Sequence, residues 1–312
     1  MQDQLFSKLL QEWATDNSPV FVVGPERSGT SLLFQQVSNH PEFCDFSEAT
    51  VETFCFTSPW LLLAESGPDN YEMRLYVGQD NWDEFQKKIQ FIVEANREAD
   101  SRGLPKTYLY EENRPKIWEA RQYGTLLRTF FYFAWQNLGK KRLVEKTPAH
   151  VRSLPEVYDV FPNAKVLVCT REPSEIIASH RKRFESEVAL GVDRNAEELQ
   201  WLNKPLDEFI SYFKEVDDII RHHLSQGNAL LVVPYSELTE YAKDTMQSVF
   251  EFVGVNTIAS NSNDAGDRPA QDWDPLLNKP PQSNKIDIAA YLSESEVLRV
   301  KKLKECLVDT WR

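Results

Sequence analysis

The stretch Val20-Phe-Val-Val-Gly-Pro-Glu-Arg-Ser-Gly-Thr-Ser-Leu-Leu33 leads from an apolar run through a glycine-bracketed loop into a second apolar segment. This order predicts a strand, a phosphate-binding loop and a helix. Gly24 and Gly29 keep the G-x-x-x-x-G spacing of a P-loop, although the lysine of a mononucleotide site is missing. Glycines let the backbone approach an anion closely, and the first turn of the helix offers free N–H groups. We therefore expect a phosphate cradle made of Arg27, Ser28, Gly29, Thr30 and Ser31.

A second stretch repeats the change from an apolar run to a polar turn and a helix. It reads Lys165-Val-Leu-Val-Cys-Thr-Arg-Glu-Pro-Ser-Glu-Ile-Ile-Ala-Ser179. Arg171 stands at the end of the expected strand, and Ser179 follows about two helical turns later at ~3.6 residues per turn. The two side chains can therefore face one anion from the same side. The pair predicts a second phosphate site.

Together the two motifs resemble those of the sulfotransferases that use 3′-phosphoadenosine 5′-phosphosulfate (PAPS), and the resemblance covers roughly residues 20–184. It implies that the first loop holds the 5′-phosphosulfate of the donor. Arg171 and Ser179 would hold the 3′-phosphate, and the by-product would be adenosine 3′,5′-bisphosphate. It also implies an α/β fold of the P-loop type, with a central parallel sheet flanked by helices and with helical insertions.

A third polar cluster follows the apolar part of Arg142-Leu-Val-Glu-Lys-Thr-Pro-Ala-His150, a short predicted strand. The similarity to tyrosylprotein sulfotransferases aligns Lys146 with the strand-end lysine that assists the leaving group. It also aligns Glu48, by its spacing from Arg27, with the base that takes the acceptor proton. Many bacterial members share Glu-Lys-Thr-Pro-x-His, so His150 competes for that role, and an unperturbed imidazole with a pKa of ~6.5 suits it. We prefer Glu48, while a structural role for His150 stays open.

The length of 312 residues suffices for one large α/β domain, and we expect a single sulfotransferase domain over residues 1–312. From about 57 to 120 the pattern is helical and rich in aromatic residues, which predicts an insertion on the substrate side. Within it, Phe85, Ile89 and Ile92 or Val93 fall on one helix face and indicate core packing. Other helices are expected over residues 3–15, 30–38, 123–138, 206–224, 236–253 and 293–311.

Two further stretches are charged or polar. Residues 185–205 lack a clean core face and indicate a possible lid, and residues 256–284 form a long loop of a kind that is usually functional or disordered.

The formal net charge of −13 argues against a nucleic-acid-binding surface, which is normally basic. The highly anionic donor must then be met by local positive charge at Arg27, Lys146 and Arg171. No apolar run approaches the ~20 residues of a membrane helix. No secretory pattern or C-x-x-C pair occurs, so we expect a cytoplasmic protein with reduced cysteines and without a metal.

The sequence gives little information about the acceptor. We expect a hydroxylated partner, and the first candidate is the β-hydroxyl of an acyl chain on a carrier protein, as in the sulfotransferase domains of alkene-forming polyketide synthases. A free small molecule or a tyrosine is the alternative acceptor. From another functional class, the glycine loop alone would also suit a nucleotide kinase or a nucleotide-binding module without catalysis, although the missing lysine counts against the kinase.

Overall fold

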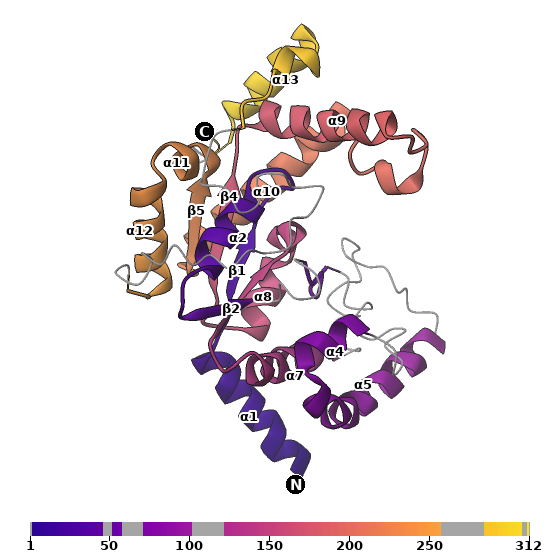
Figure 1. Cartoon of the computed structure of the whole chain (residues 1–312), viewed down its shortest axis with the longest axis vertical. Helices are drawn as coiled ribbons and strands as arrows, with labels where there is room; N and C mark the ends of the chain where they lie inside the picture. The colour runs from indigo at the N-terminus through magenta and orange to yellow at the C-terminus, as the bar shows by residue number, and fades with distance from the viewer. Residues whose placement is uncertain are drawn as a thin grey trace. The chain divides into compact units, whose positions relative to one another are not determined.

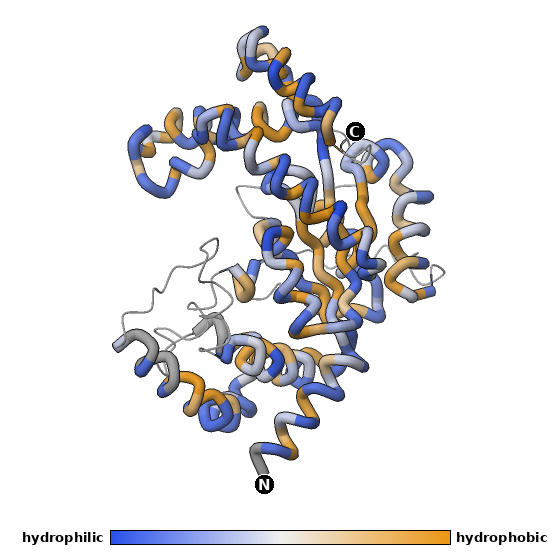
Figure 2. The backbone as a smooth tube through the Cα atoms, turned by 180° about the vertical axis from the view of Figure 1, so that it is seen from behind, coloured by the Kyte–Doolittle hydropathy of each residue, from blue (hydrophilic) through white to orange (hydrophobic). Residues whose placement is uncertain are grey.

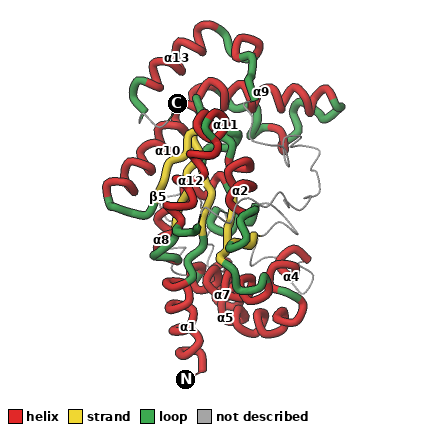
Figure 3. The backbone as a smooth tube through the Cα atoms, turned by 60° about the vertical axis from the view of Figure 1, so that its left-hand side comes forward, coloured by secondary structure: helices red, strands yellow, loops and turns green. Residues whose placement is uncertain are grey.

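The computed structural model describes residues 2–45, 52–57, 71–101, 122–256, 284–307 and 311. Within these ranges the chain forms one parallel sheet of five strands in the order β2-β3-β1-β4-β5 (Figure 3, yellow). The strands are β1 (Val20–Val23), β2 (Phe43–Asp45), β3 (Arg142–Lys146), β4 (Lys165–Thr170) and β5 (Leu230–Pro234). Helices flank the sheet (Figure 1), so the predicted α/β fold is confirmed.

The central strands owe their position to unbroken apolar runs. All four residues of β1 are buried, as are residues 166–170 of β4. Strands that are covered on both faces lose the alternation of apolar and polar residues, which is why these runs are continuous. Figure 2 shows the runs as orange tube segments. At the edge, β2 pairs with β3 in parallel register, with Phe43 opposite Arg142.

The chain divides into two compact units, and neither is continuous in sequence. The first contains residues 1–21 and 37–166, and the second contains residues 22–36 and 167–312. The boundary passes through β1 and through β4. A single functional domain over residues 1–312 stays a prediction.

The first unit is built around an aromatic core. It contains the helices α1 (Gln2–Asp16), α4 (Tyr71–Val77), α5 (Trp82–Ser101), α7 (Tyr123–Asn137) and α8 (Leu154–Val160), and the 3-10 helices η1 (Gln79–Asn81) and η2 (Pro148–Ser153). The rings of Phe21, Phe131 and Phe161 contact one another, with centroids 5.0–6.0 Å apart. On α5, Phe85, Ile89 and Ile92 of the predicted face are fully buried, whereas the alternative Val93 is only partly buried. The helices α4 and α5 and the 3-10 helix η1 fall in the range expected for the insertion, whereas residues 58–70 and 102–120 of that range lie outside the described residues.

The second unit contains most of α2 (Thr30–Ser38). Its other helices are α9 (Pro173–Ala189), α10 (Leu206–Ser225), α11 (Tyr235–Glu240), α12 (Ala242–Val253) and α13 (Glu294–Lys304), with η3 (Glu197–Leu199) and η5 (Ile288–Ala290). The helix expected over 236–253 is broken at Tyr241, and the last helix ends at Lys304. In the part of the chain that the structure describes, no helix has the length and apolar character needed to cross a membrane.

The stretch 185–205 differs from its sequence-based description. The helix α9 continues to Ala189, and Leu199 and Leu202 are buried in a cluster with Phe184 of α9. The apolar residues of this stretch are divided between the end of α9 and a 3-10 turn, so they share no helical period and the sequence shows no core face. The prediction that the stretch lacks a core face is wrong, and its role as a lid stays a prediction.

Candidate functional site

The glycine-bracketed loop of the second unit is shaped by close backbone packing. Gly24 has a φ of 142° and Gly29 a φ of 105°, a region that side chains rarely adopt. A Cβ atom at Gly24 would fall on the carbonyl oxygen of Cys169, and one at Gly29 would fall on the ring of Tyr235. Both glycines are therefore required where the loop passes β4 and the start of α11.

Arg27 joins the two motifs that the sequence singles out. Its Nε donates a hydrogen bond to Ser179 Oγ at 3.1 Å, and its carbonyl oxygen accepts one from Arg171 Nη1 at 3.4 Å. Its φ of 69° is left-handed, a conformation that costs a non-glycine residue on the order of 1–3 kcal/mol and that is enriched at functional sites. The structure thus brings Arg27, Arg171 and Ser179 together, and their roles in holding the donor stay predictions.

Arg171 is buried and held on several sides. Its Nε donates to Glu175 Oε2 at 2.7 Å, and its Nη2 donates to the carbonyl oxygen of Asn284 at 2.9 Å. Its guanidinium carbon lies 4.3 Å from the ring centroid of Tyr235, whose hydroxyl accepts a hydrogen bond from the Asn284 N–H. Sequence reasoning missed these three partners. Of these partners, only Glu175 could have been suggested by the sequence, because it follows Arg171 by four positions, the spacing of a helical ion pair.

The loop offers polar groups that suit an anionic ligand. Ser28 Oγ is buried and has no hydrogen-bond partner among the described residues. Buried hydroxyls are normally paired, so this one fits an oxygen of a bound phosphate. Thr30 and Ser31 lie in the first turn of α2, where backbone N–H groups point out of the helix end. The loop therefore offers polar groups suited to an anionic ligand, and its role as the phosphate cradle stays a prediction.

His180 follows Ser179 and stays uncharged. It is 2% exposed, its Nε2 lies 3.3 Å from the carbonyl oxygen of Glu26, and burial, reinforced by the charge of Arg27, lowers its pKa to about 3. Near neutral pH His180 therefore adds no positive charge beside Ser179.

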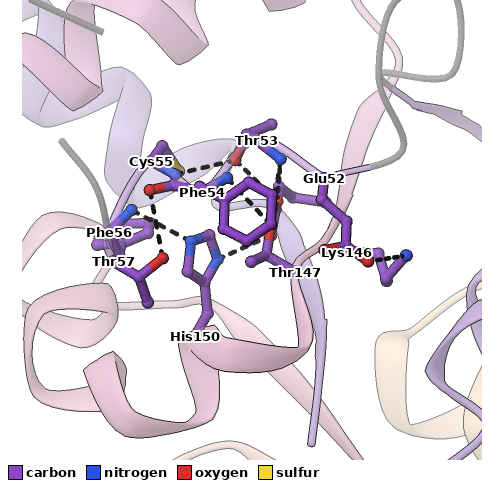
Figure 4. A network of polar contacts seen from close by, with 10 residues as sticks. Glu52, Thr53, Phe54, Cys55, Phe56, Thr57, Lys146, Thr147 and His150 are labelled. Atoms are coloured by element: carbon purple, nitrogen blue, oxygen red, sulfur yellow. Dashed lines mark hydrogen bonds and ion pairs between the residues drawn. The ribbon is translucent and has the colours of Figure 1, made fainter. Parts of the chain in front are cut away.

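The first unit holds the strand-end lysine. Lys146 ends β3, its side chain is 1% exposed, and its Nζ lies 2.6 Å from Glu52 Oε1 (Figure 4). The Glu52 side chain is 29% exposed. Sequence reasoning missed Glu52, because a carboxylate four positions after Glu48 carries no pattern of its own. Only the need of a buried ammonium for a counter-ion could have indicated such a partner.

A buried network surrounds Glu145, the residue before Lys146. Glu145 Oε1 accepts hydrogen bonds from Thr53 Oγ1 at 2.8 Å and Thr147 Oγ1 at 2.7 Å, and Oε2 lies 3.1 Å from His150 Nδ1. Burial alone would raise the pKa of Glu145. The interactions with His150, Thr147 and Thr53 outweigh burial, so the pKa lies below its usual value. Glu145 is therefore an ionised anchor at the end of β3.

Both ring nitrogens of His150 have partners. Its Nε2 accepts a hydrogen bond from the Phe56 N–H at 3.2 Å. A backbone N–H can only donate, so we assign the imidazole proton to Nδ1, which donates to Glu145. The imidazole is fully buried. This arrangement favours a positioning role for His150 over that of the base, while Glu48 lies outside the described residues.

We predict that His150→Ala lowers the free energy of unfolding by about 2–3 kcal/mol, because it leaves a buried carboxylate without its charge-assisted partner. Urea denaturation followed by circular dichroism measures this loss. His222→Ala is the control, since His222 is exposed at the end of α10 and its removal should change stability by less than about 0.5 kcal/mol. Equal losses in the two variants would contradict the anchoring role.

Comparison with known proteins places the chain in a family. The model of a protein family described as "Sulfotransferase family" matches residues 19–259. The chain belongs to the sulfotransferase family. The resemblance drawn from the two phosphate motifs is thereby confirmed.

Curated sulfotransferases resemble part of this chain. The "Omega-hydroxy-beta-dihydromenaquinone-9 sulfotransferase Stf3" proteins of Mycobacterium bovis (strain ATCC BAA-935 / AF2122/97) and Mycobacterium tuberculosis (strain CDC 1551 / Oshkosh) are each 26% identical to it over 200 residues. The match covers 57% of this chain and 48% of each relative, so the chain spans about half the length of these relatives. The crystal structure of sulfotransferase STF9 from Mycobacterium avium has a TM-score of 0.50 at 14% identity, over 97% of this chain and 80% of that one. This likeness bears on the fold.

Within this sulfotransferase-family chain, the predicted site residues fall into two groups. Arg27, Arg171 and Ser179 lie together in the second unit, with Ser28, Gly29, Thr30 and Ser31 on the adjoining loop and helix start. Lys146 and His150 belong to the first unit. Among the described residues, no group of three or more His, Cys, Asp or Glu side chains could hold a metal ion.

Proposed function

We propose that this chain transfers a sulfuryl group from PAPS to the hydroxyl of an acceptor. The observation that carries the proposal is the hydrogen bond between Arg27 of the glycine loop and Ser179 of α9, with Arg171 beside them. Two phosphate-binding motifs in contact suit a donor with phosphates at both the 5′ and the 3′ position. Arg27, Ser28, Gly29, Thr30 and Ser31 would hold the phosphosulfate, and Arg171 and Ser179 the 3′-phosphate.

The reaction needs charge neutralisation and one proton acceptor. The bond from sulfur to the bridging 5′-phosphate oxygen breaks, and its electron pair stays with the phosphate. A new bond forms from sulfur to the acceptor oxygen, whose proton passes to the base. Lys146 would stabilise the departing oxygen, and Arg27 with the loop N–H groups would stabilise the sulfuryl oxygens. Glu48 is our proposed base.

For the acceptor, our first candidate is a β-hydroxyl on a carrier-bound acyl chain. A free apolar molecule with a hydroxyl is the second candidate, because the curated relatives are named as sulfotransferases of an omega-hydroxylated menaquinone. The exposed Phe54, two positions after Glu52, would suit an apolar acceptor of either kind. We also propose that residues 57–120 contribute to acceptor binding and that residues 185–205 act as a lid of the same functional domain.

A paired screen distinguishes the acceptors. The protein is incubated with PAPS and with matched hydroxylated chains, either free or loaded on a carrier protein, and mass spectrometry detects a sulfate adduct. Transfer to the carrier-bound chains alone supports the first candidate, and transfer to the free chains alone supports the second. If PAPS is neither bound nor consumed, the proposed function is contradicted.

We predict that Arg171→Ala weakens binding of adenosine 3′,5′-bisphosphate by roughly 10- to 150-fold, which corresponds to the loss of about 1.5–3 kcal/mol for a charge-assisted contact. AMP lacks the 3′-phosphate, so its affinity should change far less. Isothermal titration calorimetry measures both ligands. Arg299→Ala, which removes an exposed arginine paired with Asp207, is the control. An equal loss for the two nucleotides would remove Arg171 from the 3′-phosphate site.

A further inference from the structure

The two members of the Lys146–Glu52 ion pair differ in their exposure to solvent. The Lys146 side chain is 1% exposed, whereas that of Glu52 is 29% exposed, and Nζ and Oε1 are 2.6 Å apart. A buried ammonium cannot give up an anionic partner unless another anion replaces it. A partly exposed carboxylate can turn towards water. In this pair, Glu52 is the member that can leave.

The neighbouring carboxylate cannot take over the role of counter-ion. Both oxygens of Glu145 already have partners, namely Thr53 and Thr147 at Oε1 and His150 at Oε2. Glu145 is also fully buried with His150. Glu52 therefore supplies the counter-charge that Lys146 uses.

The backbone that carries Glu52 is held independently of the ion pair. The N–H groups of Thr53 and Phe54 donate to Thr147 Oγ1 at 3.1 and 3.2 Å, and the Phe56 N–H donates to His150. Figure 4 shows these contacts at the centre and left of the view and the Glu52–Lys146 pair at its right. A change in the Glu52 side chain should therefore leave the segment in place.

We propose that Glu52 is a positioning residue that holds Lys146 before the donor binds, yields it to the donor phosphate, and takes it back as the bisphosphate product leaves. This inference rests on the proposed function, in which Lys146 faces the departing oxygen. The Glu52 carboxylate and the nucleotide phosphate compete for one buried cation. Glu52 thus weakens the binding of donor and product and speeds product release.

The test is Glu52→Gln, which keeps the shape of the side chain and removes its charge. We expect the dissociation constant of adenosine 3′,5′-bisphosphate, measured by calorimetry, to fall roughly 2- to 5-fold, the effect of a partly exposed ion pair. Turnover should fall in parallel, because the product leaves more slowly. A structural role alone would weaken binding or leave it unchanged.

Further variants test whether the effect on binding comes from the Glu52–Lys146 ion pair. Glu12→Gln removes the same charge from the exposed Lys8–Glu12 pair of the same unit and should change neither quantity. In a Lys146→Met background, Glu52→Gln should no longer tighten binding. Glu52→Asp keeps the charge at the end of a shorter side chain and should give a smaller gain in the same direction. It serves as the test if the glutamine variant does not fold.

Two failures can be told apart. Wild-type protein that does not bind the bisphosphate contradicts the proposed function itself. Wild-type protein that binds it, with folded Glu52 variants that bind it no more tightly, overturns only the role of Glu52. A gain that persists in the Lys146→Met background also overturns that role, since the effect would then be a general one of net charge.

Discussion

Lys146→Ala should lower turnover by roughly 10²–10³-fold, the usual cost of removing one group that stabilises a developing oxyanion. The effect on donor affinity should be much smaller. Lys146 starts in an ion pair with Glu52, so donor binding exchanges one anionic partner for another. The full benefit of the ammonium appears only as negative charge grows on the departing oxygen.

Steady-state kinetics with PAPS, together with calorimetry of adenosine 3′,5′-bisphosphate, measures the two quantities separately. Lys141→Ala is a matched control, because it removes an exposed lysine just before β3 and should keep normal turnover. A loss of donor affinity with intact turnover would contradict the role of Lys146 in the chemical step.

Glu48→Gln should lower turnover by roughly 10²–10⁴-fold if Glu48 takes the acceptor proton, because the amide keeps the shape but loses the basicity. Bisphosphate binding should survive. His150→Asn should have the smaller effect on turnover, since both imidazole nitrogens are already engaged by Glu145 and Phe56. Kinetics at saturating acceptor compares the two variants.

Glu42→Gln, a substitution of an exposed carboxylate before β2, controls for the change in net charge. Thermal unfolding must show that both test variants fold. A nearly inactive histidine variant beside an active Glu48→Gln would transfer the role of base to His150. The proton on Nδ1 would then have to move, or the contact with Phe56 to open, before the imidazole could accept another.

Much of the sheet could be predicted from single stretches of sequence. Val20–Val23 and Lys165–Thr170 are apolar without alternation, as expected for strands that are covered on both faces. Each runs into a turn and a helix whose start is marked by glycine or proline. Local composition is enough here, because burial requires apolar side chains wherever the strand lies in the chain.

Prediction failed where packing joins distant pieces. The core of residues 185–205 depends on Leu199 and Leu202 meeting Phe184, and no helical period connects them. Similarly, Gly29 needs to be glycine because the ring of Tyr235 lies against it. Tyr235 belongs to α11, far from the loop in the sequence, so the steric reason is invisible in the loop itself.

The sequence by itself determined the family, the two phosphate motifs and the strand-end position of Lys146, because each depends on residue types at short, regular spacing. Only the tertiary structure decided their partners. It pairs Lys146 with Glu52, joins Arg27 to Ser179, and uses both nitrogens of His150. An ion pair or a buried hydrogen bond forms between whichever groups the fold brings within about 3 Å. The partners Lys146 and Glu52 are 94 positions apart in the sequence, and Arg27 and Ser179 are 152 positions apart. Tertiary packing sets the distance within each pair, so no local sequence pattern can reveal it.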